Sequence, residues 1–223
     1  HITQQILTGM GRLKKLGAIG TDVAMQVKPM LMKALSYADA AIGKDYADMI
    51  QAKTAATIAP VQIRQIEYLY MRSFFNDIAI SDSNAYRFFY NRSKTGWQKQ
   101  NSYTKAMIAL IAFRNNNEQW AVQQIVPSLL ENSIQDARKG MFWKTTYTNS
   151  WYESPITHQS MLISCFEEIN GKEKKYTAAI DAMRTWLLLN KQTNNWKTAI
   201  ATADACYALL LNGSNWLNNK RTV

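Results

Sequence analysis

Apolar residues recur at intervals of three and four along most of the chain, which is the period of an α-helix with one buried face. Ile180, Met183 and Leu187 follow this spacing, and so do Ile200, Ala203, Tyr207, Leu210 and Leu211. The pattern predicts helices over residues 4–16, 23–42, 60–75, 83–91, 102–114, 119–137, 155–169, 173–189 and 199–211.

Proline, glycine and polar residues predict where these helices bend or end. Pro127 stands inside residues 119–137 and should kink that helix or mark a fresh start. Residues 44–57 are polar and predict a connection or a helix extension. Asn212 and Gly213 form a typical left-handed terminator after the last helix.

A tryptophan precedes three of the predicted helices, and a threonine follows each tryptophan at a similar distance. The pairs are Trp97 with Thr104, Trp151 with Thr157 and Trp196 with Thr202. Such self-similarity is typical of repeat architectures, in which each unit buries its apolar face against the next. The tryptophans are 54 and 45 positions apart, whereas tetratricopeptide units repeat every 34 or so residues. We therefore predict an all-α fold of antiparallel helical hairpins, an incomplete α/α toroid with alanine-rich helices inside, as a single domain over residues 1–223.

The charge of the chain changes this picture little. Lys and Arg number 26 against 16 Asp and Glu, a formal net charge of +10, which could attract nucleic acid. The basic residues are scattered, however, and their densest groups (Arg12, Lys14, Lys15 and Lys172, Lys174, Lys175) fall at predicted helix ends. Because nucleic-acid binding needs a clustered basic face, we expect no nucleic-acid partner.

The chain also carries few signs of processing or targeting. No apolar run approaches the roughly 20 residues that span a bilayer. The start, His1 onwards, is not a signal segment, and we expect the chain to be cut from a longer protein. Cys165 and Cys206 lie in apolar helical stretches, where we expect free, buried thiols.

No arrangement of residues predicts catalysis. His158 follows Thr157 near Glu153 and Gln159 and could act as a base, but no serine or cysteine can be assigned as its nucleophile. No pair of histidines, cysteines or carboxylates has ligand spacing, and no glycine-rich phosphate loop is present. We expect no enzyme activity, no metal and no cofactor.

The tryptophans have two interpretations. Each can wedge a loop against its hairpin and bury a large apolar area, which the identical placement favours. Alternatively Trp151, Tyr152, Glu153 and Asp204 line a central cavity, as in α/α toroids that bind sugars. A lyase-type toroid enzyme and an α-solenoid that binds a protein on its concave surface therefore stay open as alternatives.

The stretch over residues 183–211 resembles the closing hairpin of the thioester-type α/α-toroid domain of alpha-2-macroglobulins. In that family a helix end of the form W-L-x-x-Q-N leads into a helix start of the form W-x-S-T-x-A-T. Residues 150–163 resemble the preceding helix, and residues 100–106 resemble the one before that. Residues 67–75 look typical of bacterial members, so the likeness covers almost the whole chain.

The resemblance implies a fragment of a large bacterial protease inhibitor that is periplasmic or extracellular and often lipid-anchored. Such proteins trap proteases: cleavage of a bait segment elsewhere in the chain rearranges the inhibitor around the protease. The partners would be proteases and other domains of the same chain. The reactive motif of the family is Cys-x-Glu-Gln, and Cys165 is followed by Phe166, Glu167 and Glu168. A carboxylic acid replaces the glutamine, so we expect no thioester at Cys165.

Overall fold

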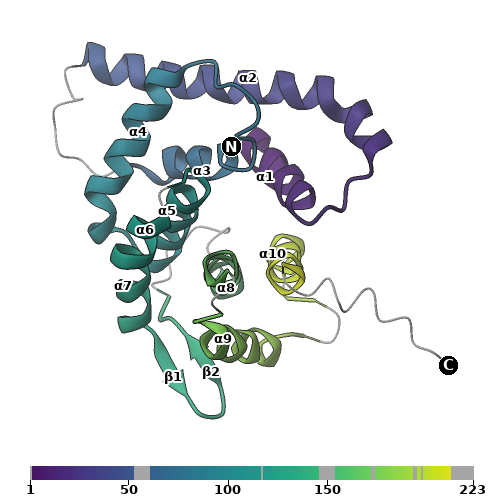
Figure 1. Ribbon diagram of the computed structural model, residues 1–223, viewed down its shortest axis with the longest axis vertical. Coiled ribbons are helices and arrows are strands. Elements are labelled where there is room, and N and C mark those ends of the chain that lie inside the picture. The colour runs from purple at the N-terminus through teal and green to yellow at the C-terminus, as the bar shows by residue number, and fades with distance from the viewer. Residues whose placement is uncertain are drawn as a thin grey trace. The chain divides into compact units, whose positions relative to one another are not determined.

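In a computed structural model of the chain, α-helices account for most of the described residues and are accompanied by two short strands (Figure 1). The structure describes residues 2–52, 61–116, 118–145, 154–171, 174–192, 195–196 and 198–211. The chain divides into two compact units, an N-terminal unit (His1–Asn117) and a C-terminal unit (Glu118–Val223). Predominantly helical structure confirms the coarse part of the predicted fold class, whereas a single domain over both units stays a prediction.

The N-terminal unit consists of helices in its described part. They are α1 (Ile2–Lys15), α2 (Thr21–Gln51), α3 (Ile63–Arg72), α4 (Ser83–Gly96), the 3-10 turn η2 (Trp97–Lys99) and α5 (Ser102–Arg114). Helix α3 packs against α1, α2, α4 and α5. It is therefore the central element of this unit.

Helices α3 and α5 supply most of the core of the N-terminal unit. In α3, the residues Gln65–Arg72 are all buried, and in α5 the run Ala106–Ala112 is buried without a break. A helix that is apolar on all sides is covered on all sides, which explains why α5 lacks the polar face of a surface helix. The basic group Arg12, Lys14 and Lys15 occupies the last turn of α1, as predicted.

The C-terminal unit begins with an irregular helix and a β-hairpin. Its elements are α6 (Glu118–Trp120), the π-helical segment η3 (Ala121–Ile125), α7 (Val126–Glu131), β1 (Ile134–Asp136), β2 (Gly140–Phe142), α8 (Pro155–Asn170), α9 (Thr177–Leu189) and α10 (Ala199–Leu210). The strands are antiparallel, with Ile134 opposite Phe142 and Asp136 opposite Gly140. The hairpin strand β2 packs on α9.

Helix α8 is the core of the C-terminal unit. Most of its residues are buried, and it packs against both α9 and α10. Helix α9 is amphipathic and buries Ile180, Met183 and Leu187, the three residues that the sequence pattern placed on one face. The one-sided burial of α9 follows from helical periodicity, whereas the burial of α8 on most sides reflects its central place between α9 and α10.

Two sequence predictions about the bounds and faces of these helices were wrong. The helix predicted over residues 119–137 ends at Glu131, and the hairpin strand β1 follows it. Residues 43–51 continue α2, which is the helix extension that the sequence analysis gave as one of two possibilities for this polar segment. In α10 the face predicted to be buried contains Ile200, which is exposed.

The buried face of α10 is made of small residues instead. Ala201, Asp204, Ala205 and Ala208 are buried together with Tyr207. Small side chains allow the close approach of α10 to α8, and this contact outweighs the larger apolar groups of the predicted face. Cys206, expected to be buried, is exposed on the other side of α10, whereas Cys165 is buried in α8 as predicted. The predicted terminator, Asn212 and Gly213, lies outside the described residues.

Candidate functional site

The start of α10 shows how a tryptophan fastens a helix hairpin. The indole N–H of Trp196 donates a hydrogen bond to the carbonyl of Leu187, at 2.9 Å, near the end of α9. The backbone N–H of Trp196 donates to the hydroxyl of Thr202, at 3.0 Å. Since the ring is also buried, Trp196 fixes the end of α9 to the first turns of α10.

Thr198 and Thr202 complete this helix start. Thr198 caps α10, because its hydroxyl accepts from the backbone N–H of Ala201. The Thr202 hydroxyl in turn donates to the carbonyl of Thr198. The predicted pair of Trp196 and Thr202 is therefore in direct contact.

The start of α5 has the same parts in a slightly different arrangement. Asn101 caps the helix by accepting from the backbone N–H of Thr104, at 2.9 Å. Thr104 is buried, and so is Trp97 in the turn η2 just before the helix. The ammonium of Lys105 lies 5.4 Å from the centre of the Trp97 ring, a cation–π contact.

The start of α8 repeats the cap but not, within the described residues, the tryptophan. The Ser154 hydroxyl accepts from the backbone N–H of Thr157 and donates to its hydroxyl, both at 3.1 Å. Thr157 is buried. Trp151 lies outside the described residues, so its predicted role as a wedge stays a prediction.

Comparison of the three starts shows what the repeat encodes. Each cap side chain accepts from the backbone N–H three residues later, in the pairs Asn101 with Thr104, Ser154 with Thr157 and Thr198 with Ala201. Thr104 and Thr157 thus hold the third helical position, whereas Thr202 holds the fourth. The sequence showed where the threonines are. Whether a threonine holds the third or the fourth position of its helix depends on which preceding residue becomes the cap.

His158 is buried in the first turn of α8 and is not a surface group. Burial lowers the pKa of the imidazole to about 4, because a charged form loses its hydration there. His158 is therefore neutral at pH 7. Glu153, with which the sequence paired it, lies outside the described residues.

Polar side chains on α8 hold neighbouring elements to this helix. The Gln159 amide donates to the carbonyl of Met141 in β2, at 2.8 Å, and to that of Met183 in α9, at 3.1 Å. Glu167 forms an ion pair with Arg184 of α9. These side chains hold β2 and α9 against α8, which favours a structural role for the polar residues of α8.

Only one residue of the alternative site, a cavity lined by aromatic and acidic side chains, is among the described residues. Asp204 is buried on α10, while Trp151, Tyr152 and Glu153 lie outside the described residues. Nothing in the described residues therefore assembles that set.

A buried polar cluster in the N-terminal unit was missed by the sequence reasoning. Asp39 of α2 accepts from the Tyr68 hydroxyl at 2.7 Å and from the backbone N–H of Ser81 at 2.9 Å. Its carboxylate lies 3.4 Å from Nε of Arg72, and both charged side chains are almost fully buried. Burial, followed by the charge of Asp39, raises the pKa of Tyr68 far above its usual range. The signal was Asp39 itself, an acid on the same helical face as the apolar Leu35 and Ile42.

The described residues give no sign of a metal centre or a membrane span. No three of their His, Cys, Asp and Glu side chains gather where an ion could be held. None of the helices described is both long enough and apolar enough to cross a bilayer.

Comparison with known proteins adds no relative to this picture. No model of a protein family, no curated protein and no solved structure matches the chain.

Proposed function

We propose that this chain is a non-catalytic helical domain of a bacterial alpha-2-macroglobulin-like protease inhibitor, a conformational trap. In this proposal the domain is part of an α/α toroid and moves as a rigid body when the bait segment of the parent protein is cut. Proteases and the other domains of the parent are its partners. The parent is periplasmic or extracellular.

The fastening of α9 to α10 is the observation that carries the proposal. The resemblance to the family is most specific over residues 183–211, and Trp196 lies within that stretch. There, the buried ring of Trp196 and its hydrogen bonds to Leu187 and Thr202 tie two helices into one body. A domain that must move without deforming needs such joints between its helices.

The packing within each unit supports a toroid. In the N-terminal unit α3 contacts both α4 and α5, and in the C-terminal unit α8 contacts both α9 and α10. Helix α9 presents one apolar face, whereas α5 and α8 are buried over most of their residues. Inner helices that pack on each other and outer helices that cover them are what an α/α superhelix requires.

The state of His158 supports a structural role over a catalytic one. A general base acts best when its pKa lies near the working pH, and the pKa of this imidazole is lowered to about 4. His158 is also buried. It has the properties of a neutral core residue.

A protease assay on the full-length parent tests the proposal. The parent is incubated with a broad-specificity protease, and the remaining activity is then measured on a large protein and on a small peptide. A trap lowers the activity on the protein and leaves that on the peptide. If the parent is cut and both activities are unchanged, the inhibitor proposal is wrong, and a toroid that binds a sugar or a protein becomes the better proposal.

A further inference from the structure

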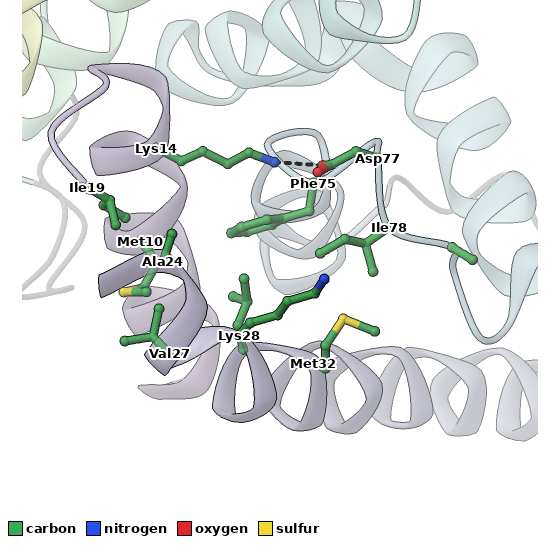
Figure 2. Close-up of a pocket in the computed structure, with 12 residues that line it drawn as sticks. Met10, Lys14, Ile19, Ala24, Val27, Lys28, Met32, Phe75, Asp77 and Ile78 are labelled. Atoms are coloured by element: carbon green, nitrogen blue, oxygen red, sulfur yellow. Dashed lines mark hydrogen bonds and ion pairs between the residues drawn. The ribbon is translucent and has the colours of Figure 1, made fainter. Parts of the chain in front are cut away.

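The N-terminal unit contains a pocket that the proposed function does not use. It has a volume of about 550 Å³ and lies between α1, the first half of α2 and residues 75–79 (Figure 2). All of these elements belong to the same unit. Sites for small molecules typically have volumes of about 300–1,000 Å³, so the pocket is large enough for one.

Apolar side chains form most of the lining. Phe75 and Ile78 lie on one side, Met10 and Val27 lie opposite them beside α1 and α2, and Met32 extends toward Ile78 (Figure 2). Methionines adapt their shape to irregular apolar partners. The pocket can therefore hold a flexible apolar chain that has no fixed shape.

The first half of α2 leaves its apolar residues exposed or half-buried. Among residues 21–34 none is buried, although Val23, Met25, Met30 and Met32 are large and apolar. The buried residues of this helix begin at Leu35. The pocket therefore lies along the part of α2 that extends beyond the core of the unit and carries apolar side chains that are not buried.

Two lysines lie in the pocket, and they differ in their surroundings. Lys14 donates to Asp77 at 2.7 Å, and this hydrogen bond lowers the pKa of the Asp77 carboxyl. The ammonium of Lys14 also lies 5.5 Å from the centre of the Phe75 ring. Its charge is therefore already compensated.

Lys28 has no charged or hydrogen-bonding partner among the described residues. It extends from α2 toward the segment that carries Phe75 and Ile78 (Figure 2), and no hydrogen bond or ion pair with another described residue engages its ammonium group. With Lys14 and Asp77 cancelling each other, the pocket carries one uncompensated positive charge beside an apolar surface.

We infer that this pocket binds a single-chain amphiphile with an anionic head group, the chemistry of a free fatty acid. The chain lies against Phe75, Ile78 and Met32, where its burial removes apolar surface from water. The carboxylate faces Lys28, where it gains a charge-assisted hydrogen bond. This inference does not rest on the proposed function, because the trap assay and the ligand assay can fail independently.

The test uses the whole 223-residue chain with carbon-13 labels in its methionine methyl groups and decanoate as the probe. We expect the resonances of Met10 and Met32 to shift saturably, while that of Met183, in the core of the C-terminal unit, does not move. Decanol, which has the same chain without the charge, should bind more weakly. Equal binding of decanol, or shifts that do not single out Met10 and Met32, would overturn the inference.

Variants separate the charge from the cavity. Lys28→Gln should weaken decanoate binding about three- to five-fold, the effect expected of an exposed ion pair. Lys33→Gln is the matched control, because Lys33 is exposed on the same helix and does not line the pocket. Ala24→Trp should fill the pocket and abolish binding while circular dichroism shows unchanged helicity. Undiminished binding in both Lys28→Gln and Ala24→Trp would place the ligand elsewhere and contradict the inference.

Discussion

Single residues decide how firmly the helices of each unit are joined. Trp196 is the clearest case, because one side chain fills a buried site and also makes a hydrogen bond to α9. The sequence could predict this residue, since a large aromatic group at the same point of three helix starts indicates a packing role. The hydrogen bond of Trp196 to the carbonyl of Leu187 could not be predicted, because it depends on the path of the loop between α9 and α10.

Trp196→Ala should therefore destabilise the chain by about 3–5 kcal/mol, the cost of removing a large buried aromatic side chain. Urea unfolding followed by circular dichroism measures the change. Leu189→Ala is the control at an exposed position on α9, with an expected effect within about 0.5 kcal/mol. Equal midpoints for Trp196→Ala and the wild type would show that the ring contributes no packing.

His158 should make the stability depend on pH. Burial lowers the folded-state pKa from 6.5 to about 4, so the unfolded chain binds more protons between these values. The stability that His158 contributes is complete above about pH 6.5 and is lost as the pH falls toward 4. Between pH 7.5 and 5 we expect a loss of about 2 kcal/mol.

The comparison with His158→Gln isolates this effect from other titrating groups. Urea midpoints of both proteins are measured at the two pH values, and the wild type should lose more stability than the variant. A parallel loss in both would mean that the imidazole titrates normally in the folded chain.

At the scale of elements, helix starts were easier to predict than the chain between helices. The bounds of α5, Ser102–Arg114, agree with the prediction, because Asn101 is a good cap and an unbroken apolar run follows it. The hairpin of β1 and β2 was missed, because residues 119–137 also fit a helical period. The overlooked signal was Asp136, which accepts from the backbone N–H groups of Arg138 and Lys139, followed by Gly140.

Gly140 is required by this hairpin. Its φ is +82°, and a Cβ atom there would lie 2.1 Å from the carbonyl oxygen of Ala182 in α9. We expect Gly140→Ala to cost about 2 kcal/mol or more, from backbone strain and from the displacement of α9. Thermal unfolding measures it.

Gly96→Ala is the matched control for that substitution. Gly96 has open space around its would-be Cβ atom and no positive φ, so the change should be neutral or slightly stabilising. A similar loss in both variants would mean that the hairpin does not depend on close contact with α9.

The buried cluster of Asp39 and Arg72 joins α2 to α3 in the N-terminal unit. Arg72→Leu leaves the Asp39 carboxylate buried without its cation and should cost about 3–5 kcal/mol. The double variant Asp39→Leu with Arg72→Leu should recover much of that loss, because the second substitution removes the unpaired charge. Denaturant unfolding of the two single variants and the double variant gives the coupling, and strict additivity would contradict a direct pair.

At the scale of the whole molecule, both units repeat one packing rule. A buried helix contacts the next two helices of the chain, α3 with α4 and α5 and α8 with α9 and α10. Periodicity alone predicts amphipathic helices and therefore favours a layered helical protein. It cannot predict that small residues make the face of α10 that packs on α8, because that choice follows from the distance between two helices.

A protease assay on variants of the full-length parent tests the proposal that this domain is a working part of a protease trap. The full-length parent, its Trp196→Ala variant and its Leu189→Ala variant are each incubated with a broad-specificity protease. The ratio of remaining activity on a large protein to that on a small peptide is then determined. We expect a ratio well below one for the parent and for Leu189→Ala, and a ratio close to one for Trp196→Ala, in which α9 and α10 are no longer tied together. A ratio of one for the cleaved parent itself would show that it does not trap the protease.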